Sequence, residues 1–147
     1  MNKTTPQLLH IFPSFGRGGI PIQISHAINY FGNKARHTII STNDDFGAKE
    51  ILNPEVQVDF PNVDYLSDGG LFKRLKNYQN YLKDLNPSAL LSYNWGAIEW
   101  VLANSFIPKI YNVHSEHGFG PDEAETTLTR RDLFRRFSLR NTDVVLV

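Results

Sequence analysis

Short apolar runs alternate with amphipathic stretches along the whole chain. Apolar runs bounded by turn residues are typical of strands, and the sequence predicts strands at residues 8–13, 37–42, 56–60, 89–93, 108–113 and 143–147. Apolar positions at helical spacing predict helices at residues 21–31, 72–85 and 95–104 and in a basic stretch that begins at Thr126 or Thr129. Residues 56–60 alternate between apolar and polar, so we expect that strand at the periphery of the sheet.

The alternation of strands with helices predicts an α/β fold. Several predicted strands are apolar throughout, which is typical of a parallel sheet covered on both faces. We therefore expect a doubly wound, mostly parallel, Rossmann-like sheet with right-handed crossovers. No repeat or linker divides the chain, so residues 1–147 are expected to form a single domain. The last residues form a strand that we expect to be buried, which suggests that the sequence is part of a longer chain.

The composition excludes several classes of protein. The 147 residues include 41% hydrophobic side chains and balanced charges, 15 basic against 15 acidic, which is unlike a disordered chain or a coiled coil. The neutral net charge argues against a dedicated nucleic-acid binder. The absence of cysteine excludes disulfides and thiolate metal sites, and it suits a cytoplasmic location. No apolar run reaches the roughly 18 residues that a membrane span needs.

Candidate chemistry lies in the loops after three strands, because ligands of open α/β sheets bind beyond the carboxyl ends of the strands. The first loop contains Gly16, Arg17, Gly18 and Gly19 and leads into a helix. Glycines and a helix N-terminus favour the close approach of an anion, to which Arg17 could add charge. A tight turn without a ligand explains the same residues about as well. Pro21 stands where a dinucleotide fingerprint has its third glycine.

The loop expected after the fifth strand contains His114, Glu116 and His117. Histidine suits proton transfer near neutral pH, and two histidines at the mouth of a parallel sheet favour a functional role. Capping of backbone groups after the strand is the simpler alternative. A metal site is a weaker one, because loop histidines lack fixed spacing. Its further ligands would be Asp122, Glu123 and Glu125.

The loop after the fourth strand contains Tyr93, Asn94 and Trp95. Amides bond sugar hydroxyls and an indole covers the apolar face of a sugar ring, so this loop is a candidate carbohydrate contact. An N-capping Asn94 and a half-buried Trp95 are the simpler interpretation.

The basic helix near the C-terminus contains Arg130, Arg131, Arg135 and Arg136. We expect it to cover the sheet with a solvated arginine face. Peripheral contact with anionic lipid headgroups at the inner face of the membrane is the alternative.

Three segments together resemble glycosyltransferase family 4, a group of nucleotide-sugar-dependent enzymes with the GT-B fold. The segments are residues 8–19, residues 113–118, and the arginine-rich helix followed by residues 143–147. The similarity covers essentially the whole chain, in the right order and spacing. It departs from the family at Pro21, where many members have an acidic residue.

The resemblance implies a retaining, metal-independent glycosyltransferase of polysaccharide biosynthesis, with two Rossmann-like domains and no cofactor other than the nucleotide-sugar co-substrate. This chain would be the N-terminal, acceptor-binding domain, and the acceptor would be a glycan or lipid-linked. Gly18 and Gly19 would approach the donor diphosphate or the acceptor. His114 would bond the transferred sugar, and Glu116 and His117 would line the same mouth. Tyr93, Asn94 and Trp95 would face the acceptor.

The donor-binding domain has no counterpart in these residues, so we expect the chain alone to be nearly inactive. Two other functions stay open. One is an NAD-dependent oxidoreductase in which Asp44 or Asp45 bonds a ribose. The other is a non-catalytic module that binds a sugar or a partner.

Overall fold

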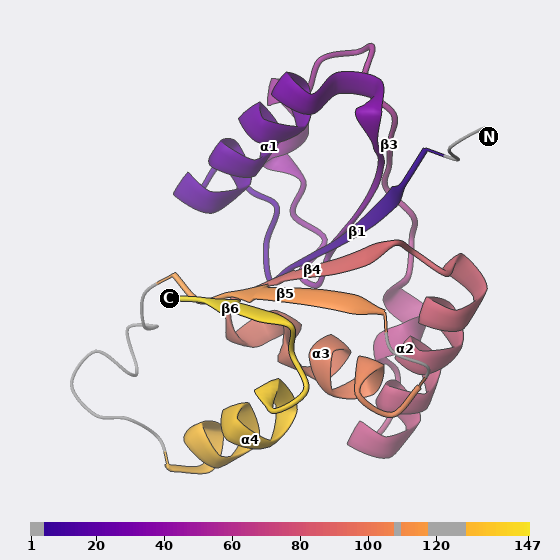
Figure 1. Cartoon of the computed structure of the whole chain (residues 1–147), viewed down its shortest axis with the longest axis vertical. Helices are drawn as coiled ribbons and strands as arrows, with labels where there is room; N and C mark the ends of the chain where they lie inside the picture. Colours follow the sequence, from indigo (N-terminus) through magenta and orange to yellow (C-terminus); the bar gives the residue numbers. More distant parts are fainter. Residues whose placement is uncertain (1–4, 108–109, 118–128) are drawn as a thin grey trace.

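The computed structural model describes residues 5–107, 110–117 and 129–147. Their core is one sheet of six parallel strands in the order β3-β2-β1-β4-β5-β6, with helices on both faces (Figure 1). This strand order is that of the Rossmann fold, in which the chain reverses direction across the sheet between β1 and β4. The doubly wound α/β fold predicted from the sequence is confirmed.

The strands are short and mostly apolar. Their bounds are β1 Gln7–Phe12, β2 Arg36–Ser41, β3 Val58–Asp59, β4 Ala89–Tyr93, β5 Tyr111–Ser115 and β6 Val144–Leu146. The central strands β1 and β4 place Leu9, Ile11 and Leu90 in the interior with no exposed surface. β3 pairs only with β2 and lies at the edge of the sheet, as the alternating pattern predicted.

Helices cover the sheet unequally. Helix α1 (Gly19–Phe31) lies on one face, and α2 (Leu71–Leu85), α3 (Ile98–Asn104) and α4 (Thr129–Leu139) lie on the other (Figure 1). Short 3-10 turns complete the chain at Gly32–Lys34, Gly47–Ile51, Asp64–Ser67 and Trp95–Ala97. The core on the α2 side includes Trp100, which stacks on Tyr78 with 4.2 Å between ring centroids. None of the helices in the described ranges is long and apolar enough to cross a bilayer.

Two strands differ from the sequence-based expectation. β5 ends at Ser115 rather than at residue 113, because its ladder continues between β4 and β6: His114 pairs with Ser92 on one side and Val145 on the other. β6, expected to be buried, is half-exposed, with 42% of Val145 and 51% of Leu146 accessible. Among the described residues it is the last strand at its side of the sheet.

The helix cap considered at Asn94 is wrong, and α2 begins after Gly70 without a side-chain cap. Asn94 does not cap α3, because a 3-10 turn separates it from Ile98 and its side chain bonds elsewhere.

Candidate functional site

The glycine loop connects the end of β1 to the start of α1. Its first glycine leaves room for Asp45, since a Cβ at Gly16 would overlap the carboxylate of that residue in its present position. Ser14 fastens the loop, since its hydroxyl donates to Asp45 Oδ2 (3.0 Å) and accepts the N–H of Gly16 (3.1 Å). The other carboxylate oxygen of Asp45 accepts the N–H of Gly47 at 3.0 Å. The loop after β2 therefore holds the glycine loop in place.

The start of α1 presents backbone donors that are not used within the described chain. The amides of Arg17, Gly19 and Ile20 have no hydrogen-bond partner among the described residues, and Gly18 at the N-cap offers no side-chain cap. The first N–H of the helix that is satisfied is that of Ile22, which donates to Gly18 O at 3.1 Å. Free amides together with the positive end of a helix dipole form an environment that favours a bound anion.

These amides face a shared recess at the carboxyl end of the sheet. The recess, about 480 Å³, is lined by residues 16–19, Asp45, Asn94 and His117. The carboxyl ends of β1, β4 and β5 all point to the left side of Figure 1. His117 of the histidine loop thus lies beside the glycine loop at this edge of the sheet.

Asn94 fixes the position of His117. Its backbone N–H donates to Ser115 O at 2.7 Å, and its side-chain Oδ1 accepts the N–H of His117 at 2.7 Å. The backbone of Asn94 adopts φ 57° and ψ 178°, a conformation that residues other than glycine rarely occupy. The His117 side chain is exposed at the rim of the recess.

His114 lies inside β5 and does not line the recess. Its ring is fully buried, with Nδ1 2.8 Å from Ser92 Oγ and Nε2 3.2 Å from Glu116 Oε1. A carboxylate only accepts hydrogen bonds, so His114 donates from Nε2 to Glu116. Within the described chain, no part of this imidazole is accessible to a ligand.

Glu116 points toward α4 rather than into the recess. Its Oε1 accepts from His114 and from Arg135 Nε (3.3 Å), and Arg135 also pairs with Asp132. The hydrogen bond from His114, assisted by the Arg135 guanidinium and opposed by burial, holds the pKa of the Glu116 carboxyl below its usual value. Glu116 is therefore an anionic link between the end of β5 and helix α4.

Trp95 faces a second hollow on the α2 side. This hollow, about 230 Å³, is lined by Trp95 together with Arg74 and Glu99, which form a hydrogen-bonded ion pair at 2.7 Å. The guanidinium carbons of Arg131 and Arg135 lie 5.5 and 5.2 Å from the centre of the Trp95 ring. The indole thus packs beneath α4.

Tyr93 is buried at the end of β4. Its hydroxyl lies 3.1 Å from His10 Nδ1, and His10 Nε2 lies 3.0 Å from His37 Nδ1. Burial raises the pKa of the Tyr93 phenol far above its usual value, and burial followed by the charge of His37 lowers the pKa of His10 to about 3. Tyr93 also lines a small hollow of about 130 Å³ beside Asn94. This neutral, hydrogen-bonded chain could not be predicted from the sequence. The pattern of an apolar strand does not reveal which side chain a histidine within it will contact.

Arg17 and the remaining carboxylates occupy less specific positions. Arg17 lines the recess, but its guanidinium pairs with Glu50 on the surface. Among residues 5–107, 110–117 and 129–147, no group of three potential metal ligands converges. The further metal ligands considered above, Asp122, Glu123 and Glu125, lie outside the described residues.

One recess therefore brings together part of the predicted site. It unites Gly16, Arg17, Gly18 and Gly19 with Asn94 and His117. It leaves Tyr93, His114, Trp95 and Glu116 in separate environments around it. The sequence analysis did not predict that Ser14 and Asp45 support the glycine loop. The one local indication was a serine two residues before the first glycine, a spacing at which a serine hydroxyl can accept a backbone N–H.

Comparison with known proteins finds similarity in structure only. Neither a family model nor a curated protein matches the sequence. A UDP-N-acetylglucosamine 2-epimerase crystal structure superposes on 97% of the chain with TM-score 0.59 and 13% identity. Acinetobacter baumannii MurG superposes on 95% with TM-score 0.56 and 13% identity. The Methanocaldococcus jannaschii UDP-GlcNAc 2-epimerase, in complex with UDP-GlcNAc and UDP, superposes on 92% with TM-score 0.53 and 15% identity.

The chain spans about two-fifths of these proteins, namely 41%, 40% and 38% of their lengths. At such low identity the likeness concerns the fold. The six-stranded parallel sheet and its helices match the Rossmann-like half-domain of the GT-B fold, which confirms the fold that the resemblance implied.

Proposed function

We propose that this chain is the N-terminal, acceptor-binding domain of a glycosyltransferase that uses a nucleotide-sugar donor. One observation carries the proposal: unpartnered amides at the start of α1 share a recess with Asn94 and with the exposed imidazole of His117. The fold supports it, because MurG and the UDP-GlcNAc 2-epimerases have a half-domain of the same architecture.

The recess has the chemistry that glycosyl transfer needs. Negative charge develops on the leaving diphosphate, and amides fixed in advance stabilise such charge; removal of one donor of this kind costs roughly 3 kcal/mol of barrier. Gly19 and Ile20 supply fixed amides here. His117 supplies an exposed imidazole that can bond a sugar hydroxyl or carry a proton. Asp45 shapes the loop but has both oxygens engaged.

We assign different roles to the two histidines of the predicted site. His117 is proposed to touch the ligand. His114, buried and bonded to Ser92 and Glu116, is proposed to act as a positioning residue that holds Glu116 against Arg135. Tyr93 and Trp95 are proposed to support the acceptor-binding surface by packing below it. Tyr93 is buried, and Trp95 is covered by arginines of α4.

We further propose that a second, donor-binding domain completes the enzyme. The structural neighbours are about two and a half times the length of this chain, and the matched part is one half-domain. Retention of anomeric configuration, independence of metal ions and membership of family 4 belong to this proposal. The 147 residues alone are then expected to bind ligand but not to turn it over.

An NAD-binding domain is the second candidate, and one observation favours it: Asp45 lies in the same recess as the glycine loop, as a ribose-binding acid would. Against it, Pro21 replaces the third glycine and the Asp45 oxygens already accept hydrogen bonds from Ser14 and Gly47. A sugar-binding module without catalysis is the third candidate.

Nuclear magnetic resonance titrations of the chain separate these candidates. We expect UDP-GlcNAc and UDP to shift the amides of Gly18, Gly19, Ile20 and His117 saturably, and NADH to leave them unchanged. Binding of UDP-GlcNAc without binding of UDP or diphosphate would favour the sugar-binding module. A saturable response to NADH alone would contradict the glycosyltransferase.

A pair of variants tests whether the backbone donors carry the binding. Gly19 occupies the first helical position, where proline is well tolerated, and Gly18 before it is extended (φ −99°, ψ 167°), as a residue preceding proline prefers. Gly19→Pro removes one amide proton, whereas Gly19→Ala keeps it and places its Cβ in open space. We expect Gly19→Pro to weaken UDP binding at least about tenfold and Gly19→Ala to preserve it. Equal affinities would refute a role for this amide.

A further inference from the structure

A broad apolar groove lies on the helical face opposite α1. It measures about 560 Å³ and is lined by residues of α2, α3 and α4, including Phe72 and Phe137, and by Phe106, which follows α3. These three side chains are 88%, 53% and 45% exposed, and the rings of Phe106 and Phe137 lie 6.4 Å apart. Leu133, on the same helix as Phe137, is 62% exposed. Large apolar side chains gathered in this way indicate an interaction surface.

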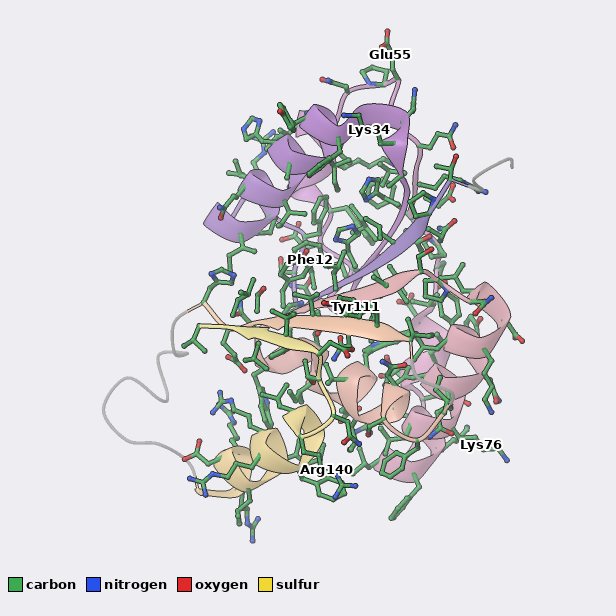
Figure 2. The ribbon with its side chains drawn as sticks, in the orientation of Figure 1. Phe12, Lys34, Glu55, Lys76, Tyr111 and Arg140 are labelled. Carbon is green, nitrogen blue, oxygen red and sulfur yellow. The ribbon has the colours of Figure 1, made fainter. Side chains whose placement is uncertain are left out.

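Cations surround this groove. Lys76 lines it, and the guanidinium carbon of Arg140 lies 4.3 Å from the centre of the Phe137 ring. Figure 2 shows Lys76 and Arg140 at the end of the molecule that the helices α2, α3 and α4 cover. Further exposed cations on these helices are Lys73, Arg130 and Arg136. Within the described part of the chain, no ion pair joins any of these five to a carboxylate.

Acidic side chains do not offset this charge. Glu99 of α3 is held by Arg74, and Asp132 of α4 is held by Arg135. Asp84 lies near the far end of α2, beside Lys83. The face therefore combines exposed aromatic rings with a net positive rim.

We propose that this α2–α3–α4 face docks on an anionic lipid bilayer. Phe72, Phe106 and Phe137 would enter the headgroup region, while Lys76, Arg136 and Arg140 would contact lipid phosphates. Aromatic and long basic side chains suit this boundary, since their apolar parts enter the acyl layer and their charged ends stay at the phosphates. The proposed surface therefore extends the arginine face of α4 to the neighbouring helices α2 and α3. It does not depend on the proposed enzymatic function.

The positions of the cations favour a bilayer over a protein partner. The core of a protein interface is depleted of charged residues. Here Lys76 is part of the groove lining and Arg140 lies against Phe137, so cations are interspersed with the aromatic rings. Phosphates that lie immediately above an apolar layer match this close mixture of rings and cations.

Vesicle sedimentation with the full 147-residue chain tests the proposal. We expect binding to phosphatidylcholine vesicles that contain phosphatidylglycerol and little binding to phosphatidylcholine alone. Added salt should weaken the binding, because electrostatic attraction is screened. The double variant Phe72→Ser with Phe137→Ser should weaken it more than tenfold, by roughly the transfer of two rings. Lys76→Glu with Arg136→Glu should also weaken it at least about tenfold, since each cation contributes roughly fivefold.

Matched controls lie on the other side of the sheet. Tyr30 and Phe31 of α1 are 83% and 52% exposed, and Lys34 and Lys49 are exposed cations. Tyr30→Ser with Phe31→Ser, and Lys34→Glu with Lys49→Glu, should bind vesicles like the native chain. All four double variants, the two in the groove and the two controls, alter exposed side chains. Circular dichroism verifies the fold of each variant.

Three results would overturn the proposal. One is failure of the native chain to bind phosphatidylglycerol vesicles. The second is equal loss of binding in the α1 controls and the groove variants, or loss in neither. The third is a concentration-dependent dimer in analytical ultracentrifugation that Phe72→Ser with Phe137→Ser abolishes while vesicle binding is unaffected, which would assign the groove to a second copy of the chain.

Discussion

His10 Nε2 lies 3.0 Å from His37 Nδ1 in the interior of the sheet, and neither imidazole has more than 4% of its surface exposed. The Tyr93 hydroxyl extends this chain at one end, while His37 Nε2 at the other end is buried without a partner among the described residues. Burial lowers the pKa of both histidines, that of His10 to about 3. The network is therefore neutral in the folded protein near neutral pH.

Acid should destabilise the fold already between about pH 7 and 5, before most carboxylates titrate. In the unfolded chain both histidines take up protons below about pH 6.5, whereas in the folded chain burial lowers both pKa values, that of His10 to about 3. The free energy of unfolding should thus fall as the pH decreases from about 6.5 toward 3. Once the unfolded group is mostly protonated, the contribution of His10 approaches about 1.4 kcal/mol for each pH unit.

Denaturant unfolding at about pH 7, 6 and 5 measures this dependence. The exposed His26 of α1 provides the control, since His26→Gln should leave the slope unchanged. A free energy of unfolding that does not vary over this range would show that the two core histidines titrate alike in both states.

Gly16 should be the least replaceable residue of the glycine loop. A methyl group there would overlap the Asp45 carboxylate, whereas at Gly19 it would meet no atom within 4 Å. Overpacking of a fixed contact typically costs about 1–3 kcal/mol. We expect Gly16→Ala to lower the free energy of unfolding by that amount and Gly19→Ala to change it little. Equal losses in the two variants would mean that Asp45 moves aside freely.

Asn94 should show opposite effects on stability and on the site. Its backbone has φ 57° and ψ 178°, a conformation that costs a non-glycine residue about 1–3 kcal/mol. Asn94→Gly should therefore stabilise the fold or leave its melting temperature unchanged. The same variant loses the acceptor for the His117 N–H, so hydrogen exchange at His117 should become faster and UDP affinity should fall.

Asn94→Asp is the matched variant, because it keeps a side-chain oxygen in the same place. Its His117 amide should stay protected. If the His117 amide in Asn94→Gly is as protected as in the native chain, the Asn94 side chain does not position that residue.

Glu116 should contribute more to stability than an exposed ion pair does. Its side chain is 17% exposed and bonds both His114 and Arg135, whereas Arg17 and Glu50 are 69% and 72% exposed. Glu116→Gln should cost about 1–3 kcal/mol, the usual loss when a buried charged partner is removed. Glu50→Gln should cost less than about 1 kcal/mol. Unfolding experiments on both variants at neutral pH provide the comparison.

The pH dependence of Glu116 has a definite sign. Because the folded pKa of its carboxyl is lowered, the stabilisation is complete above the unfolded value of 4.5 and is lost as the pH falls through the folded pKa. Glu116→Gln should remove that part of the acid sensitivity. Identical acid unfolding profiles for the native chain and Glu116→Gln below about pH 4.5 would contradict the role assigned to this link.

The sequence by itself determined which segments form strands and helices, their order along the chain, and the edge of the sheet at which the candidate site lies. Apolar spacing is a local property, so residues 21–31 and 72–85 show helices and residues 8–13 and 89–93 show strands without knowledge of their neighbours. Alternating strands and helices form parallel sheets with few topologies, and parallel strands place their following loops at one edge. The meeting of the glycine loop with His117 follows from these two rules.

Only the tertiary structure decided which side chains face the recess. His114 is buried because the ladders to β4 and β6 extend β5 past residue 113, a register that depends on partners distant in sequence. Asn94 bonds His117 rather than a helix, and Trp95 packs against arginines of α4, because those groups approach one another only across the folded sheet. The periodicity of one segment holds no information about contacts across strands, and these contacts choose the residues that meet a ligand.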